Sequence, residues 1–210
     1  MAAEVIEIFP DNPDERKIQL VVDCLKNGGL IIYPTDTVYS MGCDSKNLKA
    51  VERLCKLKKV KLNQNKFSIV CSDLRDISIY AKVSNVAFRQ MKRLLPGPYT
   101  IILPSTNDLP KVIQTNRKTI GIRIPDHKIP KMIIEKLGNP IITTSLKDDI
   151  DDIIEYPNEI EVIYEQNQDK VDMIIDGGWC GIIPSTVLDC TGNESIELVR
   201  EGLGEFNENL

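Results

Sequence analysis

The chain has 210 residues, 42% of them hydrophobic, which is enough to bury a substantial core. We predict one domain across residues 1–210, with the recognisable motifs within about residues 14–204. The formal net charge of −5 argues against a protein whose main role is to wrap nucleic acid, because affinity for phosphate backbones depends largely on lysine and arginine. Residues 1–7 lack the basic and long apolar regions of a signal peptide, and no apolar run approaches the ~18 residues of a membrane span, which predicts a soluble, cytoplasmic protein without a membrane partner.

The first predicted elements are a helix and a buried strand. Residues 12–15 (NPDE) supply a capping asparagine, a proline suited to the first helical position and two acids for the first turn. Apolar residues at helical spacing continue to residue 25, and the glycines at 28 and 29 end the helix. The apolar run 30–33 then predicts a buried strand closed by Pro34, and loops that follow such strands commonly carry ligands.

The same alternation continues to the end of the chain. We predict helices around residues 48–55, 86–94 and 131–137, and strands near 67–71, 99–103, 119–124, 140–143, 173–175, 186–189 and 196–200. The acidic stretch 148–152 (DDIDD) is typical of a solvated surface loop, with a bound hard cation as the alternative. No internal repeat divides the chain, so the pattern predicts one α/β domain.

Six cysteines are spread along the chain without a Cys-x-x-Cys pair, and one histidine is available to complete a zinc site. Free cysteine is among the most buried residue types, so we predict buried free thiols and no metal site. The cysteines are Cys24, Cys43, Cys55, Cys71, Cys180 and Cys190.

Three groups of polar residues have side chains that suit ligand binding. Residues 34–39 (PTDTVY) follow a strand and hold two hydroxyls, an acid and an aromatic ring, which suits either a small polar ligand or a turn capped by its own side chains. The cationic run 56–61 (KLKKVK) suits either phosphates or a solvated helix end. Hydroxyls at 143–145 and 185–186 lie at predicted strand ends, where they either meet phosphate oxygens or cap turns.

For two single residues, the sequence likewise allows either a ligand-binding role or a structural role. Arg123 lies inside a predicted strand, where its charge requires either an anionic ligand or an internal acid. His127 suits an acid–base role, a helix cap or a surface position. The sequence lacks a Walker loop, a Gly-x-Gly-x-x-Gly after a strand and a nucleophile elbow, so the residues alone predict an α/β domain with polar strand ends.

Taken in order, these segments resemble the YrdC/YciO family over nearly the whole chain. The segments that carry the resemblance are YPTDTVYSMGC (33–43), KLK (56–58), LPGPYT (95–100), TIGIRIPDH (119–127), TS (144–145), DGG (176–178) and PSTVLD (184–189). The resemblance implies a single YrdC-like α/β domain with a twisted mixed sheet, flanking helices and a concave cationic cleft.

The resemblance also implies an activity. Family members of the synthase type join L-threonine, bicarbonate and ATP into L-threonylcarbamoyl-adenylate and release pyrophosphate, and the product feeds the N6-threonylcarbamoyl modification of tRNA adenosines. The protein would therefore be a nucleotidyltransferase, with Mg²⁺ accompanying ATP.

Residue roles are implied in the same way. Lys56 and Lys58 would meet the nucleotide phosphates, and Ser145 and Ser185 would hydrogen-bond phosphate oxygens, with Lys56, Lys58 and Ser145 as the catalytic set. Lys147 and Arg200 would complete the ATP site. Threonine would be held by Thr35, Thr37 and Arg123.

The segments depart from the synthase pattern at identifiable positions, and these departures resemble the YciO branch. Lys58 replaces an arginine, which exchanges a planar fork for a point charge, and Lys147 replaces an asparagine. Ser40 replaces a glycine, and the proline that follows the Lys-x-Arg pattern is missing. The alternative hypothesis is a noncatalytic or ribosome-associated module that binds double-stranded RNA or tRNA through the basic surface at residues 56–66.

Overall fold

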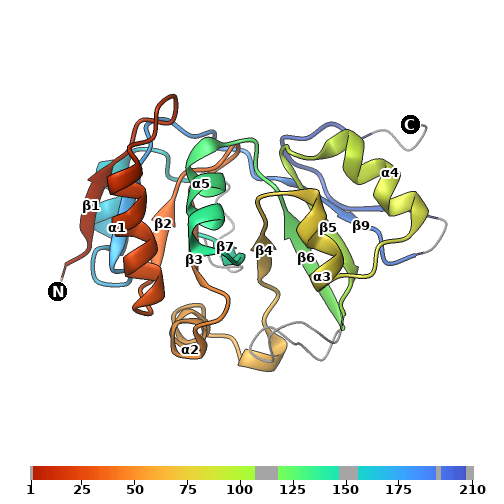
Figure 1. The fold of residues 1–210 in the computed structure, drawn as a ribbon, viewed down its shortest axis with the longest axis horizontal. Helices are drawn as coiled ribbons and strands as arrows, with labels where there is room; N and C mark the ends of the chain where they lie inside the picture. Colours follow the sequence, from red (N-terminus) through yellow and green to blue (C-terminus); the bar gives the residue numbers. More distant parts are fainter. Residues whose placement is uncertain (1, 107–117, 147–155, 193–194, 207–210) are drawn as a thin grey trace.

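The computed structural model describes residues 2–106, 118–146, 156–192 and 195–206. The described strands form one twisted mixed sheet in the order β1-β8-β2-β3-β7-β4-β6-β5-β9-β10 (Figure 1). Their bounds are β1 (Glu4–Glu7), β2 (Ile31–Tyr33), β3 (Ser40–Asp44), β4 (Ser68–Val70), β5 (Tyr99–Pro104), β6 (Thr119–Arg123), β7 (Ile141–Ser145), β8 (Met173–Asp176), β9 (Thr186–Asp189) and β10 (Glu197–Arg200).

Helices connect many of these strands. Their bounds are α1 (Glu15–Lys26), α2 (Leu48–Leu57), α3 (Ile77–Tyr80), α4 (Asn85–Leu94), α5 (Lys128–Leu137) and α6 (Ile160–Asn167), with short 3₁₀ turns η1 (Leu62–Gln64) and η2 (Leu74–Asp76). Among the described residues, no helix is long and apolar enough to cross a membrane. All six cysteines are free, as predicted, and five of them are buried.

The first helix begins two residues later than a cap at Asn12 would require. Asp14 is the N-cap, and its carboxylate accepts hydrogen bonds from the backbone N–H groups of Arg16 and Lys17, at 2.7 and 3.4 Å. Our prediction of Asn12 as the cap was therefore wrong, because the aspartate two positions further on offers an equally short acceptor. The end of the helix is as predicted, since Gly28 adopts a left-handed conformation with φ 86°.

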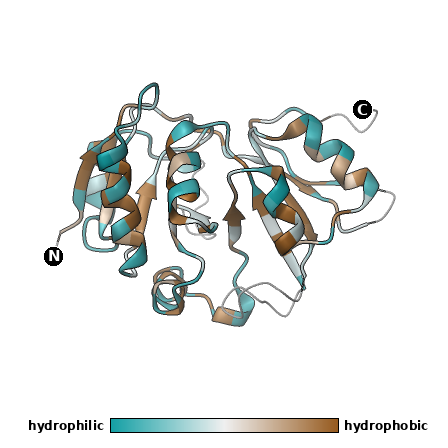
Figure 2. Ribbon diagram, in the orientation of Figure 1, coloured by the Kyte–Doolittle hydropathy of each residue, from teal (hydrophilic) through white to brown (hydrophobic). Residues whose placement is uncertain are grey.

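Strand residues alternate between two faces of the sheet. On one face, apolar side chains from most strands join a large cluster that also takes in buried residues of α2, α4 and α6. Figure 2 shows the corresponding brown strands and the mixed colouring of the helices that pack on them. This alternation follows from the two-residue period of a strand.

The opposite face of the sheet has two halves. The covered half consists of apolar residues packed beneath α1 and α5, which lie side by side (Figure 1). The open half carries small polar residues and Gly121, and no helix packs over it in the part of the chain that the structure describes. The strand residues of the covered half are Ile31, Tyr33, Val70, Ile141, Met173 and Ile175, and those of the open half are Ser40, Ser68, Thr100, Gly121, Thr143 and Ser145.

Besides the short α3, η1 and η2, three elements have no counterpart among the predicted ones. β1 is an edge strand with little apolar character, and α6 lies in a segment for which we predicted neither a helix nor a strand. β3 begins at Ser40, directly after the segment 34–39 that we interpreted as a ligand loop or a capped turn, and pairs with both β2 and β7. The acidic stretch 148–152 lies outside the described residues.

Candidate functional site

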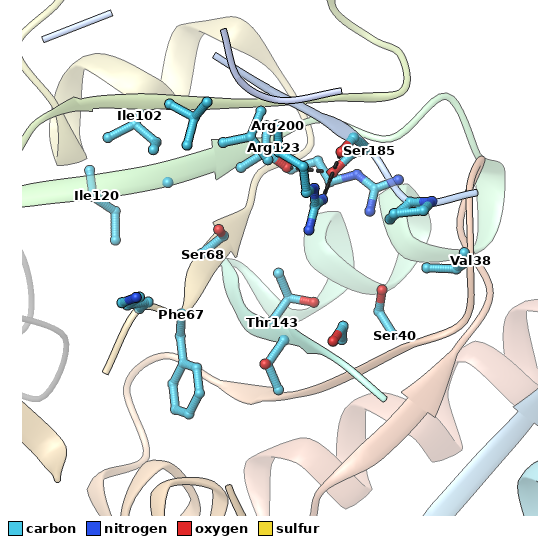
Figure 3. Close-up of a pocket in the computed structure, with 18 of the residues that line it drawn as sticks. Val38, Ser40, Phe67, Ser68, Ile102, Ile120, Arg123, Thr143, Ser185 and Arg200 are labelled. Carbon is cyan, nitrogen blue, oxygen red and sulfur yellow. Dashed lines mark hydrogen bonds between the residues drawn. The ribbon is translucent and has the colours of Figure 1, made fainter. Parts of the chain in front are cut away.

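A cavity of about 420 Å³ lies over the open half of the sheet. Figure 3 shows Ser40, Ser68, Thr143, Arg123 and Ser185 directed toward this common space. The described lining residues come from every strand between β3 and β10 in the sheet order and from the segments beside them. They are Val38, Ser40, Asn65, Lys66, Phe67, Ser68, Thr100, Ile102, Thr119, Ile120, Gly121, Arg123, Thr143, Thr144, Ser145, Tyr156, Pro184, Ser185, Val187, Val199 and Arg200.

The floor of the cavity lies close to the backbone of the strands because the side chains there are small. Ser68 lies opposite Gly121 on one neighbouring strand and opposite Thr143 on the other. A Cβ atom added at Gly121 would come within 2.4 Å of the Ser68 Oγ, so even an alanine would crowd the floor. Gly121 therefore keeps the hydroxyl of Ser68 accessible from the cavity.

The charged side chains among the described lining residues are all of one sign. Lys66, Arg123 and Arg200 are cations, and none of the described lining residues is a carboxylate. Such an arrangement attracts anionic ligands, because each cation lowers the energy of a nearby negative charge.

Arg123 is the most buried of these cations, with 6% of its surface exposed. Its Nη2 donates to Asp36 and to the hydroxyls of Thr35 and Thr37, so the internal acid that we considered for this arginine exists. Its Nε, however, is buried without a hydrogen-bond partner. An unpaired N–H of a buried guanidinium costs free energy, and an acceptor on a bound ligand would remove that cost.

Thr35 and Thr37 lie beneath the Arg123 guanidinium rather than in the cavity lining. Both are buried, and their hydroxyl oxygens are 3.2 Å apart. The Thr35 hydroxyl donates to the carbonyl of Val38 and accepts from the backbone N–H of Thr37. These bonds are those of a side-chain-capped turn, which positions Arg123, so direct contact of either hydroxyl with threonine stays a prediction.

Asp36 connects this turn to the start of α5. One carboxylate oxygen takes the Arg123 ion pair, and the other accepts from the backbone N–H of Asp126 at 3.1 Å. His127 follows and caps α5, its Nδ1 accepting from the N–H of Ile129 at 3.3 Å. Burial lowers the pKa of His127, while Asp36 and Asp126 act in the opposite direction. His127 is thus a helix cap, one of the roles that we considered.

Ser185 lines the β9 side of the cavity and has two hydrogen-bond partners. Its hydroxyl shares a hydrogen bond of 2.8 Å with that of Thr100, and its carbonyl accepts from Nη2 of Arg200 at 2.7 Å. A shift in the β9–β10 register between Leu198 and Arg200 sets the position of Arg200 on this wall. Ser185 and Arg200, which we predicted for the ATP site, therefore lie in contact beside the cavity.

Tyr33 is fully buried at the boundary between the two halves of the sheet face. Its hydroxyl donates to Oγ1 of Thr143 at 2.9 Å, and burial raises the pKa of the phenol to about 12. The phenol therefore stays protonated and holds the Thr143 hydroxyl in place on the cavity floor.

Of the predicted catalytic set, one residue lines the cavity and two do not. Ser145 lines the cavity, opposite Ser40 on β3. Lys58 donates from Nζ to the carbonyl of Leu146 at 3.1 Å, and so braces the end of β7. Lys56 is exposed on the last turn of α2 and does not belong to the described lining. Lys147, which we predicted for the ATP site, lies outside the described residues. The catalytic roles of Lys56, Lys58 and Ser145 stay predictions.

Distant segments that carry the family resemblance pack on one another here. The Tyr39 hydroxyl donates to the carbonyl of Gly178 at 2.6 Å and accepts from the N–H of Gly177. A Cβ at Gly177 would meet Pro34, and one at Gly181 would meet the carbonyl of Thr37. The loop after β8 therefore lies directly against the 34–39 turn, and only glycine permits the approach.

Several lining residues escaped the sequence interpretation. They are Asn65, Lys66, Ser68 and Tyr156, which the segments of the resemblance do not include. A usable signal exists for some of them, because small polar residues and glycine alternate with large apolar ones along the strands of the open half, as in SMGC (40–43) and TIGIR (119–123). Among the described residues, no group of histidine, cysteine or acidic side chains is placed to hold a metal ion.

Comparison with known proteins places this site in context. The family model Sua5/yciO/yrdC, described as "Telomere recombination", matches residues 23–202. The uncharacterized protein YciO of Escherichia coli (strain K12) is 41% identical over 199 residues, which cover 94% of this chain and 95% of that protein. The crystal structure of E. coli YciO aligns with a TM-score of 0.88 over 97% of both chains.

Relatives with a synthase name are more distant. The putative threonylcarbamoyl-AMP synthase of Methanocaldococcus jannaschii is 33% identical, with 95% of this chain and 93% of that protein covered. The crystal structure of Pyrococcus abyssi Sua5 in complex with L-threonine is 29% identical and aligns with a TM-score of 0.83, over 94% of this chain and 57% of that one.

Proposed function

The chain belongs to the Sua5/YciO/YrdC family, and from this premise we propose that it forms L-threonylcarbamoyl-adenylate from L-threonine, bicarbonate and ATP, for the N6-threonylcarbamoyl modification of tRNA. The observation that carries the proposal is the cavity over the open half of the sheet. Its described lining combines hydroxyls with three cations and no carboxylate, which suits a ligand rich in anionic oxygens. Its size of about 420 Å³ falls within the roughly 300–1,000 Å³ of small-molecule sites.

Arg123 supports the threonine part of the proposal. The side chain lines the cavity, so the carboxylate of an amino acid bound there would meet the guanidinium. Asp36, Thr35 and Thr37 hold one end of the guanidinium, which therefore offers a fixed donor. A donor fixed in advance binds without an entropic cost of ordering at the time of binding. The P. abyssi relative bound to L-threonine is consistent with such a site.

The hydroxyl-lined side of the cavity supports the nucleotide part. In the proposed reaction, the amine of threonine combines with carbon dioxide, an oxygen of the resulting carbamate attacks the α-phosphorus of ATP, and pyrophosphate leaves. Negative charge then builds on phosphate oxygens, so fixed donors and cations stabilise the transition state. Ser145, Ser185 and Arg200 line the cavity, and we propose that they supply such contacts. Mg²⁺ would enter with ATP as part of the substrate and would offset the charge of the phosphates.

The direct test is pyrophosphate release by the purified protein. We expect release only when ATP, Mg²⁺, L-threonine and bicarbonate are all present, together with a product of the mass of threonylcarbamoyl-adenylate. Release without threonine would indicate simple ATP hydrolysis. No release above a protein-free blank would count against the proposed activity.

A paired substitution tests whether the cavity is the site. Ser185→Ala removes a hydroxyl from the cavity wall, and we expect turnover to fall by about tenfold, since a donor to developing charge contributes at least that much. Ser78→Ala is the matched control, because Ser78 is exposed on α3 and lies outside the cavity lining. Equal rates for the two variants would argue against catalysis in this cavity.

The alternative of an RNA-binding module draws support from the lysines on and after α2. Lys56, Lys59 and Lys61 are exposed on this surface, although the whole chain is acidic with a charge of −5. This alternative predicts binding to double-stranded RNA or tRNA that weakens steeply with salt and persists when the cavity is altered by Ser185→Ala. Undetectable RNA binding at low salt would eliminate it.

A further inference from the structure

Lys66 is a cation beside the cavity that neither the family resemblance nor the synthase pattern singles out. We propose that Lys66 binds the phosphate groups of ATP, so that the nucleotide lies along the side of the cavity formed by the segment before β4. The proposal rests on the proposed function, because it assigns one contact of the nucleotide within the same site. It rests on three observations, which concern the backbone at Lys66, the charges near it and the polar groups beside it.

The backbone at Lys66 is held on both sides. Asn65 is 2% exposed, donates from Nδ2 to the carbonyl of Leu62 and accepts at Oδ1 from the N–H of Phe67, at 3.2 Å. Phe67 is 9% exposed and belongs to the large apolar cluster, and in Figure 3 its ring points away from the cavity. Lys66 is therefore an exposed side chain between two buried anchors, and its position beside the cavity is fixed by them.

Among the described residues, no neighbouring group occupies the Lys66 ammonium, which is therefore available to a ligand. It has no hydrogen-bond or ion-pair partner among the described residues, and no carboxylate belongs to the described cavity lining. The other lysines of the basic run are placed differently, since Lys58 donates to the carbonyl of Leu146 and Lys56 lies outside the described lining. Among the described lysines, Lys66 is thus the one that lines the cavity.

The polar groups beside Lys66 complete a phosphate subsite. Ser68 is two residues further on and presents its hydroxyl to the floor, where Thr143 lies opposite it. An ammonium with three rotatable donors and a row of hydroxyls matches the oxygens of a phosphate chain better than it matches an uncharged base or sugar. In this proposal Lys66 contacts the phosphates of ATP and neither the adenine nor the ribose.

The test measures ATP binding by calorimetry with the full chain in the presence of Mg²⁺. Lys66→Ala should weaken ATP binding about tenfold, the effect expected for one hydrogen-bonded charge pair. Lys66→Arg should retain most of the affinity, because it keeps the charge. Lys61→Ala is the matched control, since Lys61 is exposed in the same basic segment but lies outside the cavity lining. Adenosine should bind all four proteins equally, because it carries no phosphate.

The outcomes separate this inference from the proposed function. If Lys66→Ala binds ATP as tightly as the unaltered chain, or if Lys61→Ala loses as much affinity, the assignment of Lys66 is wrong even when the protein releases pyrophosphate. If ATP binds and depends on Lys66 while no pyrophosphate is released, the assignment stands and the synthase activity fails. If the unaltered chain does not bind ATP, both are wrong. Equal thermal unfolding of the variants confirms that they are folded.

Discussion

The covered and open halves of one sheet face use the same strands for opposite purposes. In the covered half, isoleucines, a valine and a methionine pack beneath α1 and α5 and lose nearly all contact with water. In the open half, serines, threonines and a glycine leave a cavity of about 420 Å³. Burial of apolar surface stabilises the first half by about 25 cal/mol for each Å². The second half forgoes that stabilisation, and its hydroxyls and cations remain accessible to a ligand.

This contrast shows how a binding site and a core share one framework. β7 passes from Ile141 in the covered half to Thr143 and Ser145 in the open half within five residues. β4 changes in the same way, from Val70 to Ser68. Because both halves share strands, the rigid packing of one half fixes the positions of polar groups in the other. The following predictions test whether the covered half serves stability and the open half serves binding, from the largest expected effect to the smallest.

Arg123→Met should have the largest effect, because it alters stability and binding together. The substitution leaves the carboxylate of Asp36 largely buried without its cation, and we expect a loss of about 4 kcal/mol in the free energy of unfolding. Threonine binding should be lost as well. Urea unfolding and calorimetry measure the two effects. Arg53→Met is the control, since its ion pair with Asp172 is about two-fifths exposed and should cost under about 1 kcal/mol.

Ile133→Ala should damage the covered half alone. Ile133 is fully buried on α5, and its truncation should lower the free energy of unfolding by about 3 kcal/mol through lost burial and the cavity that remains. The affinity for ATP should be unchanged in the folded protein. Ser68→Ala should show the reverse, with little change in urea unfolding and weaker ATP binding. Similar behaviour of the two variants would contradict the separation of the halves.

Tyr33→Phe tests the boundary between the halves. It removes the hydroxyl that holds Thr143 while it keeps the ring in the core, so we expect a stability loss of about 1 kcal/mol. Pyrophosphate release should fall with little change in the KM for ATP, because Thr143 loses its fixed orientation rather than its hydroxyl. Thermal unfolding and steady-state kinetics measure these effects. A variant that matches the unaltered chain in both would show that the bond to Thr143 has no influence.

His127→Asn should have the smallest effect, which is on pH dependence. Burial lowers the pKa of His127 in the folded chain, so below its ordinary value of 6.5 the unfolded state binds more protons and stability falls as the pH falls. Asparagine also caps helices but does not titrate. His127 is the one histidine in the sequence, so between about pH 5.5 and 7.5 the variant should show a flatter stability profile in urea unfolding. Parallel profiles would contradict this.

Much of the fold was predictable because local patterns agreed with the final structure. The helical spacing before Gly28 predicted α1, and the apolar runs predicted β2, β4 to β9 and the sheet class. β3 was missed because SMGCD has no long apolar run, although its small residues Ser40 and Gly42 alternate with the apolar Met41 and Cys43, as expected for a strand. α6 has a weak apolar face, and its N-cap, Glu159, makes no side-chain capping bond, so its sequence carries little helix signal.

The candidate site, like the fold, was predictable from the sequence only in part. The sequence by itself determined the family, the α/β class and several residues of the cavity wall, among them Arg123, Ser145 and Ser185, because ordered motifs over most of the chain record them. Only the tertiary structure decided that Arg123 is shared between Asp36 and the cavity, that Thr35 and Thr37 lie beneath it, and that Lys66 lines the cavity while Lys56 does not. The reason is physical: sequence patterns give the face of a strand or helix, but the strand order and the turns between elements decide which faces meet.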